Sequence, residues 1–520
     1  MTSSSRPALP ALLKWPALAS VAMLGLSGCS VANSDDGGGA AGSDTVRVVL
    51  SQEPPTLEAC ESNLTSTGVV VRSNVTEPLI ERNPQTGDLE PKLATEWKAT
   101  SDTEWTLKLR DGVTFQDGTP FNAEAAAFTI ERAVNSKLGC NVEGYVFGDA
   151  DLAVKAVDAT TLTVTTTDPD PILPLRLSFL EVVPTSTSTT EKVREPVGTG
   201  PYKIEKWDAG QKIMLSSWDG YWGDKPAYAK AEYQWRSESS VRAAMLTSGE
   251  ADLSMGLSPD DNVGDLGIDY PNNETVALRL DANEAPLNDI RVRQAINFAI
   301  DKEGIVNSLY QGKHQVAAQL VPEGIVGHND ALKGWPFDLD KAKSLVAEAK
   351  ADGADTSKQI SLVVRNAQFP KITELGQVLQ EQLSQAGLNV KLKMLETSQH
   401  LTYQVRPFAD DEGAVAMMTQ HGNQAGDAAF TVDQYMLSAG AQSYFGTPEF
   451  DAMIKKADAA SGEERKKEFE EIFAYQNDKI VQFAHISHQT GIIGKAKSVN
   501  YTPNSSSGDE LRISEMTPAS

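Results

Sequence analysis

The stretch at residues 106–133 reads TLKLRDGVTFQDGTPFNAEAAAFTIERA, and it carries the clearest alternation of structural signals in the chain. Around its start, residues 104–110 alternate between apolar and polar, which is typical of a half-buried β-strand. Asp-Gly pairs at 111–112 and 117–118 are turn signals. Asn122 then offers an N-cap to a helix whose apolar residues recur at helical spacing. The stretch therefore predicts a strand, two turns and a helix in close succession.

The same mixture continues on both sides of this stretch. Residues 45–50 read as a first strand, and 155–166 return to strand. The glycine turn Gly198-Thr199-Gly200-Pro201 leads into another strand. A phosphate-binding loop would instead be followed by the N-terminus of a helix, so this turn is not interpreted as one. A helix with an apolar stripe starts at Asn288 or Asp289.

A strand–helix–strand unit is predicted further along the chain. Residues 360–364 form a strand, 372–383 a helical stripe ended by Gly387, and 390–394 a second strand. Such a unit favours parallel strands. Thr447-Pro448 opens a later helix, and Ser461 with Glu464 predicts a capping box for the next one. The body of the chain is thus mixed α/β.

An apolar run precedes this body and ends on a cysteine. Arg6 and Lys14 come before it, and no acidic residue appears before Cys29. The run is shorter than the roughly 20 apolar residues of a membrane span. LSGC at 26–29 resembles a bacterial lipobox, which implies a signal peptide at residues 1–28, a lipidated Cys29 and a flexible tether at 29–43. An ordinary secretory signal with a chance cysteine is the alternative.

Length and charge limit the possible functions. The chain has 520 residues, enough for two or three domains, and a formal net charge of −25. A surface this acidic argues against nucleic acid or anionic lipid as a partner. The net charge does not determine the polarity of a binding pocket.

The cysteines and histidines are few. Of the 3 cysteines, Cys60 and Cys140 remain after Cys29, and in an oxidising exterior they are expected to form a disulfide. Two separate buried thiols are the alternative. No Cys-x-x-Cys or Cys/His cluster occurs, so no metal site is expected. Among the 6 histidines, His485 and His488 are interpreted as core or hinge-edge residues.

Common catalytic motifs are missing. The sequence has no Gly-x-Ser-x-Gly, no His-Glu-x-x-His, no Walker loop, and no Gly-x-Gly-x-x-Gly after a strand. We therefore expect no enzyme and no cofactor. An envelope hydrolase is the alternative, and turnover of a bound ligand would reveal such an activity.

Four blocks of sequence together resemble one family. They lie at residues 75–97, 106–133, 197–223 and 287–306, in order along the chain. With weaker similarity from TPEFDAMIKKA onward, they resemble the extracellular solute-binding proteins of ABC importers, family 5, the peptide/nickel/opine-binding group. One departure lies in the second block, where the family usually has an acidic residue and a valine and this chain has two alanines.

The resemblance implies an α/β, periplasmic-binding-protein-like clamp of type II, with two lobes and a hinge between them, in the three-domain version of this family. By analogy, lobe I is discontinuous and takes residues 44–70, 192–280 and 486–520. A subdomain is inserted at 71–191, and lobe II spans 281–485. Ligand is enclosed as the lobes close.

The resemblance also points to a binding loop in lobe II. In peptide-binding members an Asp in this loop holds the ligand ammonium, and the matching stretch here is HGNQAGDAAF at 421–430. Asp427 or, in another alignment, Gln424 takes that position, with His421 and Asn423 beside them. If Gln424 matches, a charged anchor is replaced by neutral hydrogen bonds, and a peptide amine fits less well.

Other candidate ligand-binding residues lie in loops that would face the cleft. They are Glu53 and Thr56 after the first strand, Asn63 and Tyr145 near the expected disulfide, and Arg406, which could hold a carboxylate. For Arg406 the alternative is a surface ion pair with Asp410 or Asp411. For Tyr145 the alternative is a place in the core.

These observations predict a monomeric lipoprotein on the outer face of the cell membrane that captures short peptides and delivers them to an ABC permease. The same fold binding an opine, a sugar conjugate or a chelated metal is one alternative. A sensory or scaffold lipoprotein that feeds no importer is another.

Overall fold

A computed structural model describes residues 44–519 except 149, 262, 409–412 and 507–509. The lipobox resemblance, Cys29 and the expected tether lie outside the described residues, as do Asp410 and Asp411. The described residues belong to one compact unit. Within the described part, no helix combines the length and the apolar character that crossing a membrane requires.

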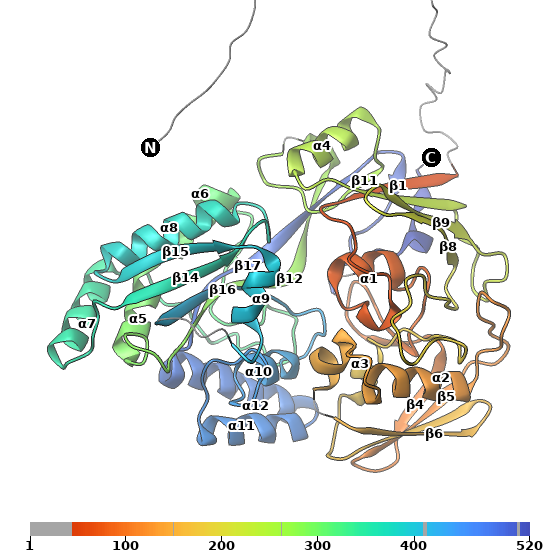
Figure 1. Ribbon diagram of the computed structural model, residues 1–520, viewed down its shortest axis with the longest axis horizontal. Helices are drawn as coiled ribbons and strands as arrows, with labels where there is room; N and C mark the ends of the chain where they lie inside the picture. The colour runs from red at the N-terminus through yellow and green to blue at the C-terminus, as the bar shows by residue number, and fades with distance from the viewer. Residues whose placement is uncertain (1–43, 149, 262, 409–412, 507–509, 520) are drawn as a thin grey trace, which may run out of the picture. The chain divides into compact units, whose positions relative to one another are not determined.

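A large mixed sheet runs through this unit (Figure 1). Its strands follow the order β15-β14-β16-β12-β17-β11-β1-β10-β9-β8, with β13 (Gln315–Val316) paired to β17. The bounds are β1 Thr45–Leu50, β8 Tyr202–Asp208, β9 Lys212–Ser217, β10 Lys230–Trp235, β11 Leu253–Ser254, β12 Gly267–Leu280, β14 Gln359–Arg365, β15 Asn389–Leu395, β16 Ala414–Gly422 and β17 Phe483–Lys495. We call β8, β9, β10, β1 and β11 the β1 half, and β14, β15 and β16 the β14 half.

Strand directions agree with the sequence pattern. β14 is parallel to both β15 and β16, so the parallel strands predicted from the strand–helix–strand unit are confirmed. β1 is parallel to β10 and β11. In each half, therefore, the parallel strands have their carboxyl ends at the same edge.

A separate four-stranded sheet contains the stretch quoted at the outset. Its order is β4-β5-β7-β6, with β4 Ala94–Ala99, β5 Glu104–Leu109, β6 Leu152–Asp158 and β7 Thr161–Thr166. The helix α2 (Ala123–Ile130) follows, and the Asn122 side chain accepts a hydrogen bond from Ala125 N at 3.0 Å. The predicted strand, helix and cap are confirmed. Two-stranded pairs join β2 (Ile80–Arg82) to β3 (Leu89–Pro91) and β18 (Val499–Asn500) to β19 (Thr517–Pro518).

Two groups of helices pack against the main sheet. Helices α5 to α8 share one buried apolar cluster with the β14 half, and α10 to α12 share another with Ala277 of β12 and Phe483 of β17 (Figure 1). Helix bounds are α1 Thr65–Val71, α3 Leu173–Leu177, α4 Ser239–Ser248, α5 Ile290–Ala299, α6 Lys302–Tyr310, α7 Leu339–Ala351, α8 Ile372–Gln385, α9 Thr397–Gln404, α10 Ala429–Tyr435, α11 Pro448–Ala459 and α12 Gly462–Tyr475.

Helix starts follow the sequence signals with one exception. Asp289 caps α5 and Thr447 caps α11 through their side chains. Ser461 precedes α12 but makes no capping hydrogen bond, so the predicted capping box is wrong. Gly462 begins that helix with φ +57°, a left-handed value that sets the entry of the chain differently from a regular capping box.

The glycine turn before β8 is explained by a close approach of two backbones. A Cβ on Gly198 would lie 2.1 Å from Val75 O, and one on Gly200 would lie 2.5 Å from Asn74 O. Only glycine leaves room for this contact. The turn therefore brings the segment before β8 against residues 74–76.

Two adjacent strands connect the β1 half to the β14 half. β12 and β17 pair antiparallel along most of their length, from Gly267–Gly494 at one end to Arg279–Phe483 at the other. The pairing is interrupted between Pro271 and Thr275, where Asn273 has φ +56°. A second register shift lies between Val276 and Ala277. We expect a hinge between the halves at the first, longer interruption.

A candidate ligand-binding cleft

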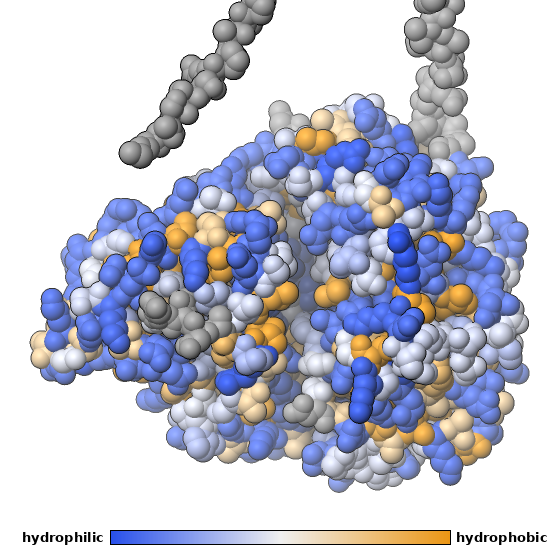
Figure 2. All heavy atoms as spheres, viewed as in Figure 1, coloured by the Kyte–Doolittle hydropathy of each residue, from blue (hydrophilic) through white to orange (hydrophobic). Residues whose placement is uncertain are grey.

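The carboxyl ends of the parallel strands point toward one another across the hinge. β17 runs from the β14 half into the β1 half, and β11 is antiparallel to it, so β11, β1 and β10 all end facing the β14 half. β16 is antiparallel to β12, so β16 and its parallel neighbour β14 end facing the β1 half. Open α/β sheets bind ligands outside such carboxyl ends. Figure 2 shows a hollow in this region, between the parts that carry α9 and α1 in Figure 1.

Asp427 lies in the loop after β16, and its carboxylate accepts three hydrogen bonds from protein groups. Arg465 of α12 donates to both oxygens, Nη2 to Oδ1 at 2.8 Å and Nε to Oδ2 at 2.9 Å. Ala429 N also donates to Oδ1. Both side chains are buried. The negative charge of Asp427 thus already has a buried partner, and its role toward a ligand stays a prediction.

His421 and Asn423 stabilise the same loop from inside. His421 Nε2 lies 2.7 Å from Thr431 Oγ1, and burial lowers the pKa of His421 to about 3. The Asn423 side chain donates to Asn273 O and Leu320 O at 3.1 Å each. Both side chains thus bind protein groups, and neither offers a free donor or acceptor to the cleft in this arrangement.

Gln424 differs from its neighbours. Its side chain is 8% exposed, yet its amide has no hydrogen-bond partner among the residues that the structure describes. The amide lies against the backbone of Gly422, where a Cβ would be 2.1 Å from Oε1. This side-chain amide is therefore available to bind a ligand or water.

Tyr145 reaches the loop from the segment beside the four-stranded sheet. Its hydroxyl donates to Gly422 O at 3.3 Å, and the neighbouring Gly144 O accepts from Gln434 Nε2 at 2.9 Å. Tyr145 is half-buried. These contacts bring the segment at 143–147 against the β14 half, next to Gln424.

The candidates after β1 have protein partners as well. The Glu53 carboxylate accepts from Trp207 Nε1 at 2.9 Å and from Gly210 N, and Thr56 Oγ1 accepts from Glu58 N. Asn63 donates to the side chain of Asn141. They lie on the β1 side of the cleft, and their role toward a ligand stays a prediction.

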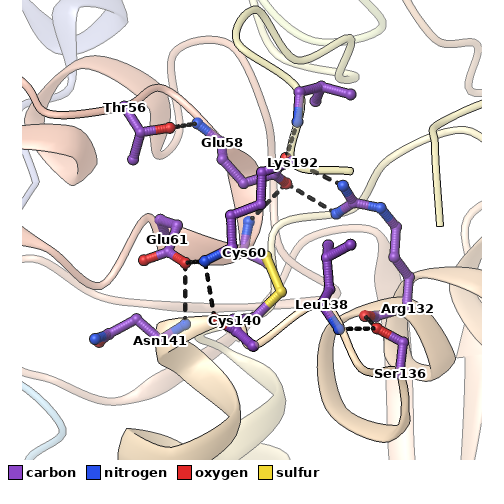
Figure 3. Close-up of a disulfide and its surroundings, with 12 residues drawn as sticks. Thr56, Glu58, Cys60, Glu61, Arg132, Ser136, Leu138, Cys140, Asn141 and Lys192 are labelled. Carbon is purple, nitrogen blue, oxygen red and sulfur yellow. Dashed lines mark hydrogen bonds and ion pairs between the residues drawn. A yellow bond between two sulfur atoms is a disulfide. The ribbon is translucent and has the colours of Figure 1, made fainter. Parts of the chain in front are cut away.

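Cys60 and Cys140 are joined by a disulfide close to these residues (Figure 3). Beside it Arg132 donates to both oxygens of Glu58 at 2.8 and 3.0 Å, and both side chains are buried. The bond and the ion pair fix the segment after β1 to the segment that follows α2. This part of the cleft wall is therefore rigidly connected.

Arg406 does not extend into the cleft as a free cation. Its guanidinium donates to the main-chain oxygens of Ser438, Gly440 and Ser443 and lies 5.1 Å from the Phe408 ring centroid. The carbonyls of this loop take the place of the ligand carboxylate that the sequence suggested. The alternative pairing with Asp410 or Asp411 falls outside the described residues.

Sequence reasoning missed a polar group at the ends of β14 and β16. Gln420 donates to Glu274 and, at 2.7 Å, to Gln489, while half-buried Arg365 ends β14. Burial lowers the pKa of Arg365, and the nearby Glu274 opposes this shift. A charged residue that ends an apolar strand was the available signal, but only the register of β14, β16 and β12 brings these residues together.

One ion pair spans the cleft. Lys371, which follows β14, binds Asp260, which follows β11, and Gln311 also donates to Asp260 at 3.1 Å. The pair joins the two edges directly.

The described residues contain no group of three or more His, Cys, Asp or Glu side chains placed to hold a metal ion. A crevice of about 370 Å³ lies behind the binding loop, between Trp97, Trp105, Leu175 and Gly426. It is lined in part by Ala425, Gly426 and Asp427 of that loop. Nothing in it suggests a catalytic arrangement.

The sequence model of the family described as bacterial extracellular solute-binding proteins, family 5, matches residues 88–443 of this chain. The chain belongs to this family. Members are non-catalytic binding components of ABC importers, and this solute-binding protein is one of them. The expectation that it is not an enzyme follows from that membership.

Individual relatives agree. The solute-binding protein is 25% identical over 426 residues to the dipeptide-binding protein of Escherichia coli K12, covering 75% of this chain and 79% of the relative. Its fold matches Helicobacter pylori DppA in complex with peptide STSA with a TM-score of 0.79 at 20% identity, over 91% of this chain and 98% of the other. It also matches Staphylococcus aureus NikA in complex with Ni(L-His)2, TM-score 0.76 at 21% identity, over 91% and 100%. The α/β clamp fold is thereby confirmed.

Proposed function

We propose that this solute-binding protein is a lipid-anchored extracytoplasmic receptor that captures short peptides between the β1 and β14 halves and delivers them to an ABC permease. The proposal adds three things to family membership: the ligand class, the anchor and the coupling to import. No covalent chemistry is involved, since the ligand is bound and released unchanged.

The observation that carries the proposal is the cleft at the carboxyl ends of β14 and β16. Its wall offers the unpartnered amide of Gln424 and the polar group of Gln420, Glu274 and Arg365. Alternating amide and charged groups suit a peptide backbone, which has donors and acceptors along its length. The dipeptide-binding protein of E. coli, similar over most of both chains, supports the same ligand class.

The experiment that tests ligand class is native mass spectrometry of the protein purified without refolding. A spread of bound masses matching short peptides is the expected result. A single mass that fits no peptide would overturn the peptide assignment.

A second candidate ligand is a metal chelate, because the fold also matches a NikA in complex with Ni(L-His)2. In that case the ligand would bring its own metal donors, since the described residues supply no cluster of three. A bound mass with the isotope pattern of nickel would distinguish this case. An opine or a sugar conjugate would appear as one discrete organic mass.

The anchor and the coupling rest on the sequence. LSGC at 26–29 supports lipidation of Cys29 and a place on the outer face of the cell membrane. Uptake by cells that carry the permease, and its loss when this protein is deleted, would test the coupling. Unchanged uptake would favour a sensory or scaffold role.

A further inference from the structure

We infer that this cleft prefers ligands with a neutral polar group, such as an N-acylated peptide end, over a free ammonium at the loop after β16, and that Gln424 makes this choice. The inference rests on the proposed peptide function and narrows its ligand class. It concerns one position of the site, the end of β16, where the chain enters the binding loop.

The first observation is the state of Gln424. The side chain is 8% exposed and its carboxamide has no partner within the described part of the chain. A carboxamide both donates and accepts hydrogen bonds but carries no charge. It therefore complements an amide group of a ligand better than an ammonium, which has donors only and needs a negative partner when it is buried.

The second observation is the contact that fixes Gln424. Its amide lies against Gly422, at a place that a Cβ on Gly422 would fill. Gly422 O in turn accepts from the Tyr145 hydroxyl. The amide thus lies where the binding loop contacts the segment that carries Tyr145.

The third observation is the pairing of the surrounding carboxylates. Asp427 is bound to Arg465, and Glu53 to Trp207 and Gly210. Glu274 accepts from Gln420 and Asn272, and Asp260 is bound to Lys371. Each of these acids is already satisfied. An ammonium at the loop would therefore compete with existing bonds for its counter-charge.

Glu143 is the exception in this neighbourhood. It is half-buried and lies two residues before Tyr145, and its carboxylate has no hydrogen-bond or ion-pair partner among the described residues. If an ammonium is held here after all, Glu143 is the carboxylate that would hold it. The test includes this residue for that reason.

The experiment measures calorimetric affinity of the purified full-length protein for two probes, Ala-Ala-Ala and N-acetyl-Ala-Ala-Ala. We expect the acetylated probe to bind at least as tightly as the free amine. Gln424→Glu places a carboxylate at the loop and should shift the ratio of affinities at least tenfold toward the free amine. Gln359→Glu makes the same charge change at the exposed start of β14, at the opposite end of the strand, and should leave the ratio unchanged.

A wild-type preference of tenfold or more for the free amine would overturn the inference. Loss of that preference in Glu143→Gln would then identify Glu143 as the anchor. An unchanged ratio in a folded Gln424→Glu protein would also overturn it, because Gln424 would not face the ligand end. If neither probe binds, the peptide function itself falls and the inference falls with it, which is a different result from reversed preference.

Discussion

Asp427 and Arg465 form a buried, two-pronged ion pair between the binding loop and α12, with N–O distances of 2.8 and 2.9 Å. The Arg465 Nη1 donates further to Asp458 O at 2.8 Å and Ala457 O at 3.0 Å. The pair therefore attaches the loop to the end of α11 and to α12 at once. Asp427, the acidic residue of the loop, therefore has a structural role: it holds the loop against these two helices.

Removing one partner of this pair should destabilise the protein strongly. Asp427→Asn leaves the Arg465 charge buried with a neutral partner, and breaking a buried pair in this way costs about 3–5 kcal/mol. Denaturant unfolding would measure it. Asp219→Asn removes an exposed pair with Lys225 and serves as the control, with an expected loss below about 1 kcal/mol. Equal effects of the two substitutions would contradict the structural role of Asp427.

A methyl group at Gly200 should not fit. Its Cβ would lie 2.5 Å from Asn74 O and 2.8 Å from Val75 C, so the two backbones must separate. Overpacking of this kind costs about 1–3 kcal/mol, and we expect Gly200→Ala to lower the melting temperature accordingly. Gly144→Ala is the matched control, because a Cβ there meets nothing within 4 Å. A Gly200→Ala protein as stable as the control would show that this contact is looser than described.

The disulfide should stabilise the β1 side of the cleft. It closes a loop between residues 80 apart in the sequence, and such a bond contributes about 2–4 kcal/mol. We expect the reductant dithiothreitol to lower the melting temperature of the wild-type protein. The Cys60→Ser/Cys140→Ser protein should melt at that lower temperature and not respond to reductant. A response of the double variant would trace the effect to something other than this bond.

Acidification should weaken the fold through its buried histidines. Burial lowers the pKa of His421 to about 3 and those of His314, His400 and His488 to about 4, against about 6.5 in the unfolded chain. Because the unfolded state binds these protons first, the stability they contribute is complete above pH 6.5 and is lost as pH falls toward 4. His421→Gln should reduce the drop in unfolding free energy between pH 7 and 5.

The contribution of Glu181 to stability has the opposite pH dependence, so it must be measured separately from that of the histidines. Burial is the main cause that raises its pKa to about 7, so its contribution is present below about pH 4.5 and is lost as pH rises through 7. Glu181→Gln should therefore remove a loss of stability between about pH 4.5 and 7, and so deepen the fall in unfolding free energy on acidification from pH 7 to 5. The same pH dependence in wild type and His421→Gln would count against the histidine account.

The lipid anchor is tested by Cys29→Ala. A lipobox needs the thiol at this position, so the variant should appear in the soluble fraction, while the wild type stays with the membrane. Ser30→Ala keeps the cysteine and serves as the control. Membrane retention of Cys29→Ala would exclude this mode of anchoring.

Local features of the fold could be predicted well because their causes are local. The alternation before Arg110 and the cap at Asn122 depend on neighbours within a few residues, and both appear as expected in β5 and α2. The exception at Ser461 is instructive, because the left-handed Gly462 changes the geometry that the capping pattern presupposes. A pattern of residue types does not determine the φ angle that a particular residue adopts.

The site was only partly predictable because its contacts are distant in sequence. Asp427 was a reasonable anchor by alignment, and only the folded chain shows Arg465, 38 residues later, bound to it. Gln424 was the other choice, and its unpartnered amide follows from burial and from the Gly422 contact, which no single-sequence pattern contains. Arg365 was missed for the same reason, since its setting depends on which strands pair.

Asn273 has a consequence for the order of folding. Its carbonyl accepts from Asn423, 150 residues away in the chain, and its amide donates to Ser505 O, 232 residues away. Contacts of such separation form slowly, because loop-closure entropy is lost before they contribute. We expect the β1 and β14 halves to assemble first and to join at Asn273 last. A ligand held between them would then slow the earliest step of unfolding.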